Sequence, residues 1–409
     1  MLALTNGLLI DGTGREPVEN ATVVVSGDRI HDVDLQGGRP EQAKVVDLKG
    51  LALMPGLFDC HVHCGGIVDY HLEDGGVPFG GRVALNDYED VRTRAIANGV
   101  TTVRSMDDFF PDIVEVRDEI AAGRLPGPRF IVCGPFFSAP GGHPGFTIHG
   151  GLKWITDYAL RQVSEPSQAR EEVKKLVDGG VDFIKAGLAD VDMWRYPRKV
   201  PKLDLKCLEA IVDEAHKHGL RAACHCEAPQ DGLDAVKAGV DSIEHLVLAG
   251  AESAEIPEGL IELMLEKNSY FVPCAATPYT FRDSLPNLPT RYPDMEIITK
   301  AVYDAGVNIA LGTDAGAPDV QFGEAVHLEM ELLQRMGLSP MDILVSATKR
   351  AAENLDLADD LGTIEKGKLA DMIVVSGNPA VRLSDAKDVK LVMKEGRVLV
   401  DKLGAVLRG

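Results

Sequence analysis

Several features that define particular protein classes are missing from this 409-residue sequence. No stretch approaches the roughly 20 uninterrupted apolar residues that a membrane helix needs. Residues 1–14 lack a basic segment followed by an apolar core, so we do not expect a signal peptide. The lysines and arginines form no basic run and the formal net charge is −21, which argues against nucleic acid. We therefore expect a globular chain with no membrane and no nucleic-acid partner.

The sequence also lacks a cysteine framework. Its seven cysteines are odd in number and have no disulfide spacing, so a reducing, cytoplasmic location is expected. Cys224 and Cys226 flank His225, and Cys60 precedes His61. On alternating strands these thiols point away from the imidazoles, which favours buried apolar cysteines over metal thiolates.

The most informative feature that is present is the pair His61 and His63, at the end of the apolar run 51–60. Because side chains alternate along a strand, both imidazoles lie on one face. Two histidines at the end of a buried strand suit a borderline-soft metal ion. Taken alone, the pair is explained equally well by two unrelated polar residues.

A repeated unit strengthens the metal interpretation. A helix-like segment ending in glycine is followed by an apolar residue and a short strand at Gly99, Gly180, Gly219, Gly239 and Gly306. This repetition predicts parallel βα units, and four of the strands end on residues that can bind metals: Lys185, His225, His245 and Asp314. Active sites of (β/α)8 barrels lie at the carboxyl ends of the strands, so these residues should converge with the histidine pair.

The two ends of the chain differ from the middle. Both contain short apolar β-type runs with tight turns and no long helical periodicity. The expected fold class is α/β: a (β/α)8 TIM barrel with a small β-sandwich domain formed from both termini. We place the sandwich in residues 1–54 and 359–409 and the barrel in residues 55–358. Two unrelated β-extensions packed on the barrel are the alternative.

The predicted barrel strands lie near residues 51–60, 100–106, 128–134, 181–187, 220–226, 240–246, 269–276 and 307–313. Long linkers rich in glycine, proline and aromatic residues follow the first, third and seventh strands. Such loops on the catalytic face of a barrel usually shape the substrate pocket.

Five motifs now identify a resemblance. They are Pro55-Gly56-Leu57-Phe58-Asp59-Cys60-His61-Val62-His63, Asp182-Phe183-Ile184-Lys185, Ile243-Glu244-His245, Leu311-Gly312-Thr313-Asp314-Ala315-Gly316, and a closing series from Ala347-Thr348 through Leu361-Gly362-Thr363-Ile364 to Gly367-Lys368-Leu369-Ala370-Asp371. The ordered set resembles the amidohydrolase superfamily, in its imidazolonepropionase-like and prolidase-like branch of binuclear metal hydrolases. The resemblance covers the chain almost end to end, and the fold it implies is the barrel and sandwich described above.

The resemblance implies a site for two divalent metal ions, expected to be zinc, with the ligands His61, His63, Lys185, His225, His245 and Asp314. In this scheme Asp314 joins the histidine pair on one ion, His225 and His245 hold the other, and an N6-carboxylysine at Lys185 bridges them. Carboxylation is needed because a free ammonium has no lone pair and repels cations. A salt-bridged or snorkelling lysine is the alternative.

The same resemblance assigns catalytic roles. A metal-bridging hydroxide would attack the substrate, with Asp314 as general base and then general acid toward the leaving nitrogen. His143, in the loop Gly141-Gly142-His143-Pro144-Gly145, would help to polarise the scissile carbonyl. A strand-end cap for Asp314 and a solvent-facing turn for His143 are the plainer alternatives. His149 is expected at the surface, and Glu244 is expected to point away from the ligands as a structural partner.

One departure affects the substrate. Prolidase-like relatives commonly carry a tyrosine two residues after the strand-five histidine, but here that position is Glu227. Tyr279 is a candidate to replace the tyrosine in substrate binding. Arg195, with Arg198 and Lys199 nearby, could bind a substrate carboxylate, although ordinary solvated charges explain these residues equally well.

The leading hypothesis is a cytoplasmic, homo-oligomeric metal-dependent amidohydrolase that cleaves the C–N bond of a small-molecule substrate, such as a dipeptide or an N-acyl amino acid. The alternative enzyme hydrolyses a cyclic amide, carbamate, urea, lactone or xenobiotic amide. A mononuclear deaminase fits less well, since such relatives generally lack the bridging lysine. The non-enzyme alternative is a catalytically silent structural relative, disfavoured because all six ligand positions are filled.

Overall fold

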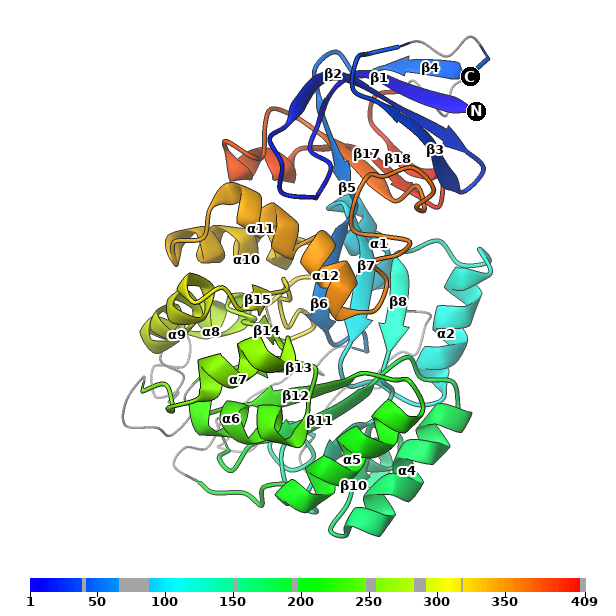
Figure 1. Cartoon of the computed structure of the whole chain (residues 1–409). Coiled ribbons are helices and arrows are strands. Elements are labelled where there is room, and N and C mark those ends of the chain that lie inside the picture. Colours follow the sequence, from blue (N-terminus) through cyan, green and yellow to red (C-terminus); the bar gives the residue numbers. More distant parts are fainter. Residues whose placement is uncertain are drawn as a thin grey trace.

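The computed structural model describes residues 1–38, 42–65, 88–149, 153–192, 198–247, 255–282, 292–317 and 319–404. Strands from the two ends of the chain form a separate layer above a barrel of parallel strands ringed by helices (Figure 1). This arrangement is the predicted (β/α)8 barrel with a β-sandwich domain built from the termini. In the described part of the chain, no helix has both the length and the apolar character required to cross a membrane.

The terminal layer is one eight-stranded sheet. Its strand order is β18-β17-β16-β5-β1-β2-β3, and β4 pairs separately with β1. The N-terminal strands are β1 (Leu2–Leu9), β2 (Val18–Ser26), β3 (Arg29–Asp34), β4 (Lys44–Asp47) and β5 (Ala52–Pro55), and the C-terminal strands are β16 (Met372–Val375), β17 (Val389–Lys394) and β18 (Arg397–Asp401). Leu4, Val23, Met372 and Leu391 belong to its own apolar core. Since β16 pairs with β5, the two ends of the chain share one sheet.

The barrel strands follow one another in chain order. They are β6 (Leu57–Val62), β7 (Val100–Ser105), β8 (Arg129–Val132), β11 (Ile184–Leu188), β12 (Ala222–Cys226), β13 (Ser242–His245), β14 (Tyr270–Val272) and β15 (Asn308–Ile309). All neighbouring pairs recorded among them are parallel. Hydrogen bonds between Val132 and Asp182 join β8 to the segment before β11, and Cys60 N–H donates to Leu311 O (2.9 Å), closing the ring.

Helices cover the outside of the barrel (Figure 1). They are α1 (Glu89–Ala97), α2 (Asp112–Ala121), α3 (Lys153–Ala159), α4 (Pro166–Asp178), α5 (Leu205–Lys217), α6 (Pro229–Ala238), α7 (Leu260–Lys267), α8 (Ala276–Phe281), α9 (Tyr292–Asp304), α10 (Glu324–Arg335), α11 (Pro340–Ser346) and α12 (Lys349–Asn354), with a 3-10 turn at Leu383–Lys387. The apolar faces of α4 and α5, including Val173 and Ile211, join the main core with barrel residues such as Phe130. Each fully buried side chain of this size contributes about 1.5–3 kcal/mol.

The five glycines of the repeated unit have the expected backbone. Their φ angles are positive, between 73° at Gly219 and 98° at Gly239. Residues that carry a Cβ rarely adopt these left-handed backbone angles. Glycine therefore ends each helix and lets the chain turn into the next strand.

Two predicted segments differ in detail. The run 51–60 is two strands: β5 belongs to the terminal sheet, and β6 begins the barrel after Gly56. A Cβ at Gly56 would lie 2.2 Å from Thr101 Oγ1, so only glycine allows this close change of layer. The linker after β8 contains β9 (Phe136–Ser138), which pairs with β11 and with β10 (Leu160–Gln162).

An ion-pair cluster joins the barrel to the terminal sheet, and it gives a stability prediction. Arg129 of β8 contacts Asp371 at 2.8 Å and Glu395 at 2.5 Å, and the Asp371 side chain is only 4% exposed. We expect Arg129→Met to lower the free energy of unfolding by about 1.5–3 kcal/mol, because it leaves a buried carboxylate without its charged donor. Urea unfolding followed by circular dichroism measures this change.

Arg124→Met is the matched control. Arg124 pairs with Glu119, and both side chains are well exposed, so the loss should stay below about 1 kcal/mol. Equal losses in the two variants would contradict a special role for Arg129.

Candidate active site

Six potential metal ligands lie at the carboxyl ends of the barrel strands. His61 is in β6, Lys185 in β11 and His225 in β12, while His245 is the last residue of β13. His63 follows β6 and Asp314 follows β15. Parallel strands carry these residues to the same end of the barrel, which explains why positions distant in sequence meet.

One donor cluster consists of His61, His63 and Asp314. Asp314 Oδ1 lies 3.0 Å from His63 Nε2 and 3.5 Å from His61 Nε2. One nitrogen or oxygen from each side chain lies within 4.8 Å of the others. Two imidazoles and a carboxylate at this spacing are suited to a divalent ion such as zinc.

The second cluster adjoins the first. The ring centroids of His61 and His245 are 4.7 Å apart, and those of His225 and His245 are 4.6 Å apart. Lys185 is 1% exposed, and its Nζ lies 5.9 Å from the centre of the Phe136 ring. Within the described residues, neither Lys185 Nζ nor His225 Nε2 has a hydrogen-bond partner.

Burial controls the protonation of this group. It lowers the pKa values of His61, His225 and His245 well below the ordinary imidazole value, and nearby cationic groups add to the effect. Burial also lowers the pKa of Lys185, although Glu244 opposes the shift. These three imidazoles are therefore neutral and have lone pairs for a metal, so they and the unpartnered Lys185 fit the expected binuclear site.

Asp59 supports the first cluster from within the strand. Its carboxylate accepts hydrogen bonds from Thr313 Oγ1 (2.6 Å), Thr313 N–H (3.0 Å) and His61 N–H (3.3 Å). His245 and Asp314 have φ angles of 78° and 62°, a region that non-glycine residues seldom adopt. Such strained backbone persists where the surrounding structure fixes it, and it is typical of functional sites.

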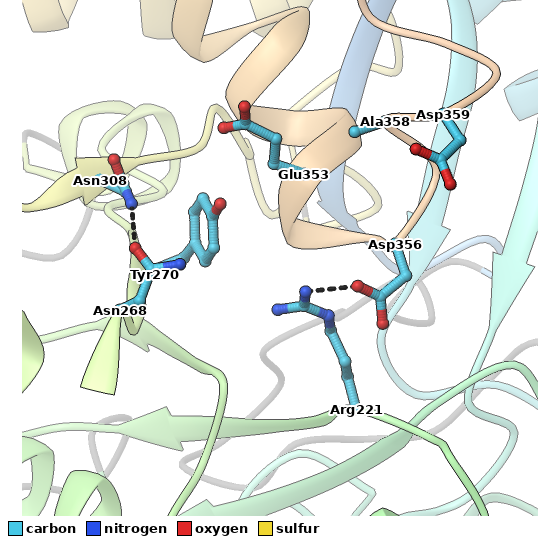
Figure 2. A pocket seen from close by; sticks show the side chains of 8 residues that line it. All are labelled: Arg221, Asn268, Tyr270, Asn308, Glu353, Asp356, Ala358 and Asp359. Atoms are coloured by element: carbon cyan, nitrogen blue, oxygen red, sulfur yellow. Dashed lines mark hydrogen bonds and ion pairs between the residues drawn. The ribbon is translucent and has the colours of Figure 1, made fainter.

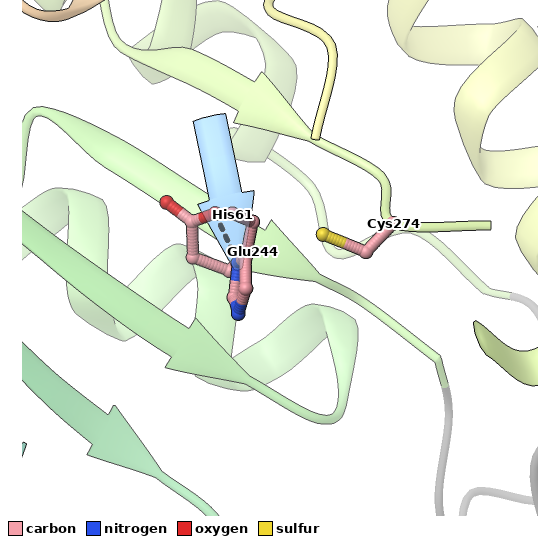
Figure 3. Close-up of side chains that lie close together, drawn as sticks. All are labelled: His61, Glu244 and Cys274. Atoms are coloured by element: carbon pink, nitrogen blue, oxygen red, sulfur yellow. Dashed lines mark hydrogen bonds and ion pairs between the residues drawn. The ribbon is translucent and has the colours of Figure 1, made fainter. Parts of the chain in front are cut away.

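Glu244 has a closer relation to the site than the sequence predicts. It was expected to point away from the ligands, but its Oε2 lies 2.8 Å from His61 Nδ1 (Figure 3). Arg104 and Ser242 each donate to Glu244 Oε1, at 2.8 and 2.7 Å. Since Nδ1 donates to the carboxylate, Nε2 of His61 keeps its lone pair facing Asp314.

Cys274 lies beside this pair but differs in character. Its Sγ falls within 4.8 Å of ligand atoms of His61 and Glu244 (Figure 3). Burial raises the pKa of its thiol well above the ordinary value, so it remains protonated. All seven cysteines are buried and free, and among them Cys60, Cys224 and Cys226 were expected to be buried.

His143 reaches the site from the loop after β9. Its ring stacks on His225 with 4.5 Å between centroids, and Thr147 Oγ1 lies 2.7 Å from its Nδ1. Burial lowers its pKa to about 3, so the imidazole is neutral. The prediction that His149 is a surface residue is wrong: its side chain is 15% exposed and pairs with Asp107 at 3.2 Å.

Tyr279 and Arg195 were also predicted to bind the substrate, and of these two only Tyr279 lies in the described part of the chain. Tyr279, in α8, receives a hydrogen bond from Arg335 at 3.2 Å and stacks against Arg282. Arg195 lies outside the described residues. Arg198 stacks over Phe146 at 4.3 Å.

Glu227 is a buried acid that lies next to the second donor cluster. It is 2% exposed, and Oε1 lies 3.6 Å from His225 Nε2. Burial, reinforced by the carboxylates of Asp231 and Asp190, raises its pKa well above the ordinary value. The residue that stands in place of the tyrosine therefore lies next to a candidate ligand.

A separate cavity of about 470 Å³ lies at the amino ends of the barrel strands (Figure 2). It is lined by Arg221, Asn268, Tyr270, Asn308, Glu353, Asp356, Ala358 and Asp359. Arg221 precedes β12, whereas His225 stands near the carboxyl end of that strand. The cavity therefore opens on the face opposite to the donor clusters.

Comparisons with known proteins agree with this architecture. Ochratoxinase from Aspergillus niger is 27% identical over 429 residues, covering 96% of this chain and 85% of that protein. Imidazolonepropionase from Shouchella clausii is 30% identical over 434 residues, covering 95% and 87%. A solved Xaa-Pro dipeptidase with bound methionine has a TM-score of 0.83 and 27% identity, covering 98% of this chain and 99% of the other. The sequence model of the amidohydrolase family matches residues 52–399, and the chain therefore belongs to that family.

Proposed function

We propose that this amidohydrolase is a binuclear metal-dependent hydrolase that cleaves an amide-type C–N bond of a small substrate, a dipeptide or an N-acyl amino acid. The observation that carries the proposal is the buried Lys185 Nζ, which has no hydrogen-bond partner among the described residues and belongs to the second donor cluster. A buried ammonium without a partner is costly, whereas a carbamate between two cations is not. Two ions held there would supply polarisation of a carbonyl and a lowered pKa for water.

Lys185 would acquire its bridging oxygens from carbon dioxide. Burial lowers the pKa of the amine and so favours the neutral form, whose lone pair attacks the carbon of carbon dioxide. A new N–C bond forms, one proton leaves the nitrogen, and an anionic carbamate remains. The carbamate would supply two oxygen ligands for the metal ions.

Asp314 and His143 would handle protons and orientation. Asp314 Oδ1 lies between the Nε2 atoms of His61 and His63, where it can accept a proton from water and later pass it to the leaving nitrogen. His143 is neutral and stacks on His225, so one ring nitrogen can donate to the substrate carbonyl. These roles require no movement of the strands.

A cyclic amide is the second candidate substrate. The relative named imidazolonepropionase and the glutamate at position 227 both favour keeping it. Tyr279 and Arg195 remain predicted substrate-binding residues, and zinc, a cytoplasmic location and a homo-oligomer remain predictions. Assays of dipeptides, N-acyl amino acids, cyclic amides and lactones with the metal-loaded protein test the ranking. Hydrolysis confined to lactones would overturn it.

The bridge can be tested through metal content. We expect the wild-type protein to hold two ions per chain and Lys185→Ala to hold fewer, with kcat lowered by at least about 10²-fold, because the variant loses the proposed bridging carbamate. Elemental analysis and steady-state kinetics measure the two effects. Added acetate should restore part of the activity by supplying two oxygens.

Lys394→Met is the control for this experiment. Lys394 is also a buried lysine, 7% exposed, but its Nζ donates to Gly127 O at 3.2 Å and it lies in the terminal sheet. Its replacement should leave the metal content at the wild-type value. Unchanged metal content and turnover in Lys185→Ala would contradict the binuclear proposal.

The proton-transfer role of Asp314 gives a separate prediction. We expect Asp314→Asn to lower kcat by about 10²–10⁴-fold, because an amide cannot accept the proton from water. Metal content is measured alongside, since Asp314 is also a proposed ligand. Asp319→Asn, at an exposed position of the same segment, should behave as wild type. Wild-type kcat in Asp314→Asn would rule out this role.

A further inference from the structure

Glu227 directly follows β12 and is buried beside the donor clusters. Its backbone N–H donates to Leu188 O at the end of β11, at 3.4 Å. Neither of its carboxylate oxygens has a hydrogen-bond partner among the described residues, and its side chain faces His225 Nε2 at 3.6 Å. A buried carboxyl group in this condition costs free energy unless something supplies a hydrogen-bond partner.

The charged residues around Glu227 that the structure describes do not supply that partner. Lys202 pairs with Asp231 at 2.5 Å, and Lys199 pairs with Asp190 at 2.9 Å. The carboxylates of Asp231, Asp190 and Asp192 all disfavour a negative charge on Glu227. The surroundings of this carboxylate are therefore acidic, although the two lysines balance part of the charge.

We propose that Glu227 forms an anionic subsite that recognises an ammonium or guanidinium group of the substrate. This inference rests on the proposed hydrolase function and specifies its substrate class: small amides that carry a cationic group. A cation beside Glu227 favours its ionised form and gains a charge-assisted hydrogen bond in a dry site. A neutral substrate of the same shape leaves the carboxylate unpaired and binds less well.

The cation can come from two parts of a peptide, and substrate pairs distinguish them. Arginine and citrulline have nearly the same shape but differ in charge. A side-chain guanidinium at the second position is tested by comparing Ala-Arg with Ala-citrulline. The same group at the first position is tested by comparing Arg-Ala with citrulline-Ala. Ala-Ala against N-formyl-Ala-Ala tests the α-ammonium. We compare kcat/KM within each pair for the metal-loaded wild-type protein, Glu227→Gln and Glu227→Asp.

We expect the wild-type protein to prefer the cationic member of at least one pair by about 10-fold or more, the size of a charged hydrogen bond. In Glu227→Gln this ratio should fall to about 3-fold or less, while Glu227→Asp should retain most of it. Glu329→Gln is the matched control: Glu329 is fully buried, but its oxygens accept from Ala275 and Ala276 N–H, so its replacement should not change the ratio.

A binding measurement separates this inference from the hydrolase proposal. Calorimetry compares L-arginine with L-citrulline, and alaninamide with N-formylalaninamide, on the same metal-loaded proteins. If no peptide is hydrolysed but the cation preference in binding depends on Glu227, the subsite stands and the proposed reaction fails. Equal binding and hydrolysis of charged and neutral partners by the wild-type protein would overturn the inference. An unchanged preference in Glu227→Gln would also overturn it. Loss of a metal ion from Glu227→Gln with the preference intact would overturn it as well, because Glu227 would then be a metal ligand.

Discussion

The closure of the barrel between β6 and β15 is the constraint on which the site depends. Asp314 N–H donates to His61 O at 2.8 Å and His63 N–H donates to Ala315 O at 2.8 Å, so the first and last strands run side by side. The chain can approach β6 this closely because Gly312 has no side chain: a Cβ there would lie 2.9 Å from His61 Cβ. Hydrogen bonds made by the backbone thus bring a histidine pair and a distant aspartate to one point before any metal is considered.

Behind His61 a group of buried polar side chains is fully paired, whereas Lys185 and His225 at the site are not. Glu244 joins Arg104, Ser242 and His61 in a closed network. Such a network fixes the ring of His61, since every member is satisfied. By contrast, Lys185 Nζ lacks a partner among the described residues. Buried polar groups without hydrogen-bond partners lower the stability of the folded protein. Proteins tolerate this loss at binding sites, where a ligand supplies the missing partners.

The order of the barrel strands, the shared terminal sheet and the positions of the strand-end residues could be predicted from glycine punctuation and apolar runs, because local turn chemistry determines them. The role of Glu244 could not, since strand alternation places it only on a face, whereas its bond to His61 depends on how far the strands are staggered in the barrel. His149 was misjudged for a related reason: its partner, Asp107, comes from the loop after β7. A usable signal existed for Asp59, which stands two residues before His61 and shares its face.

Membership of the family defines the kind of chemistry but not the molecule that undergoes it, because related barrels share ligands and differ in the loops and side chains around them. The residues that decide the substrate should therefore be those whose charge has no structural explanation. Glu244 is explained by its network, and Glu329 by the backbone N–H groups that it holds. Among the described residues Glu227 has no such partner, so we infer that the substrate supplies the group that pairs with its carboxylate.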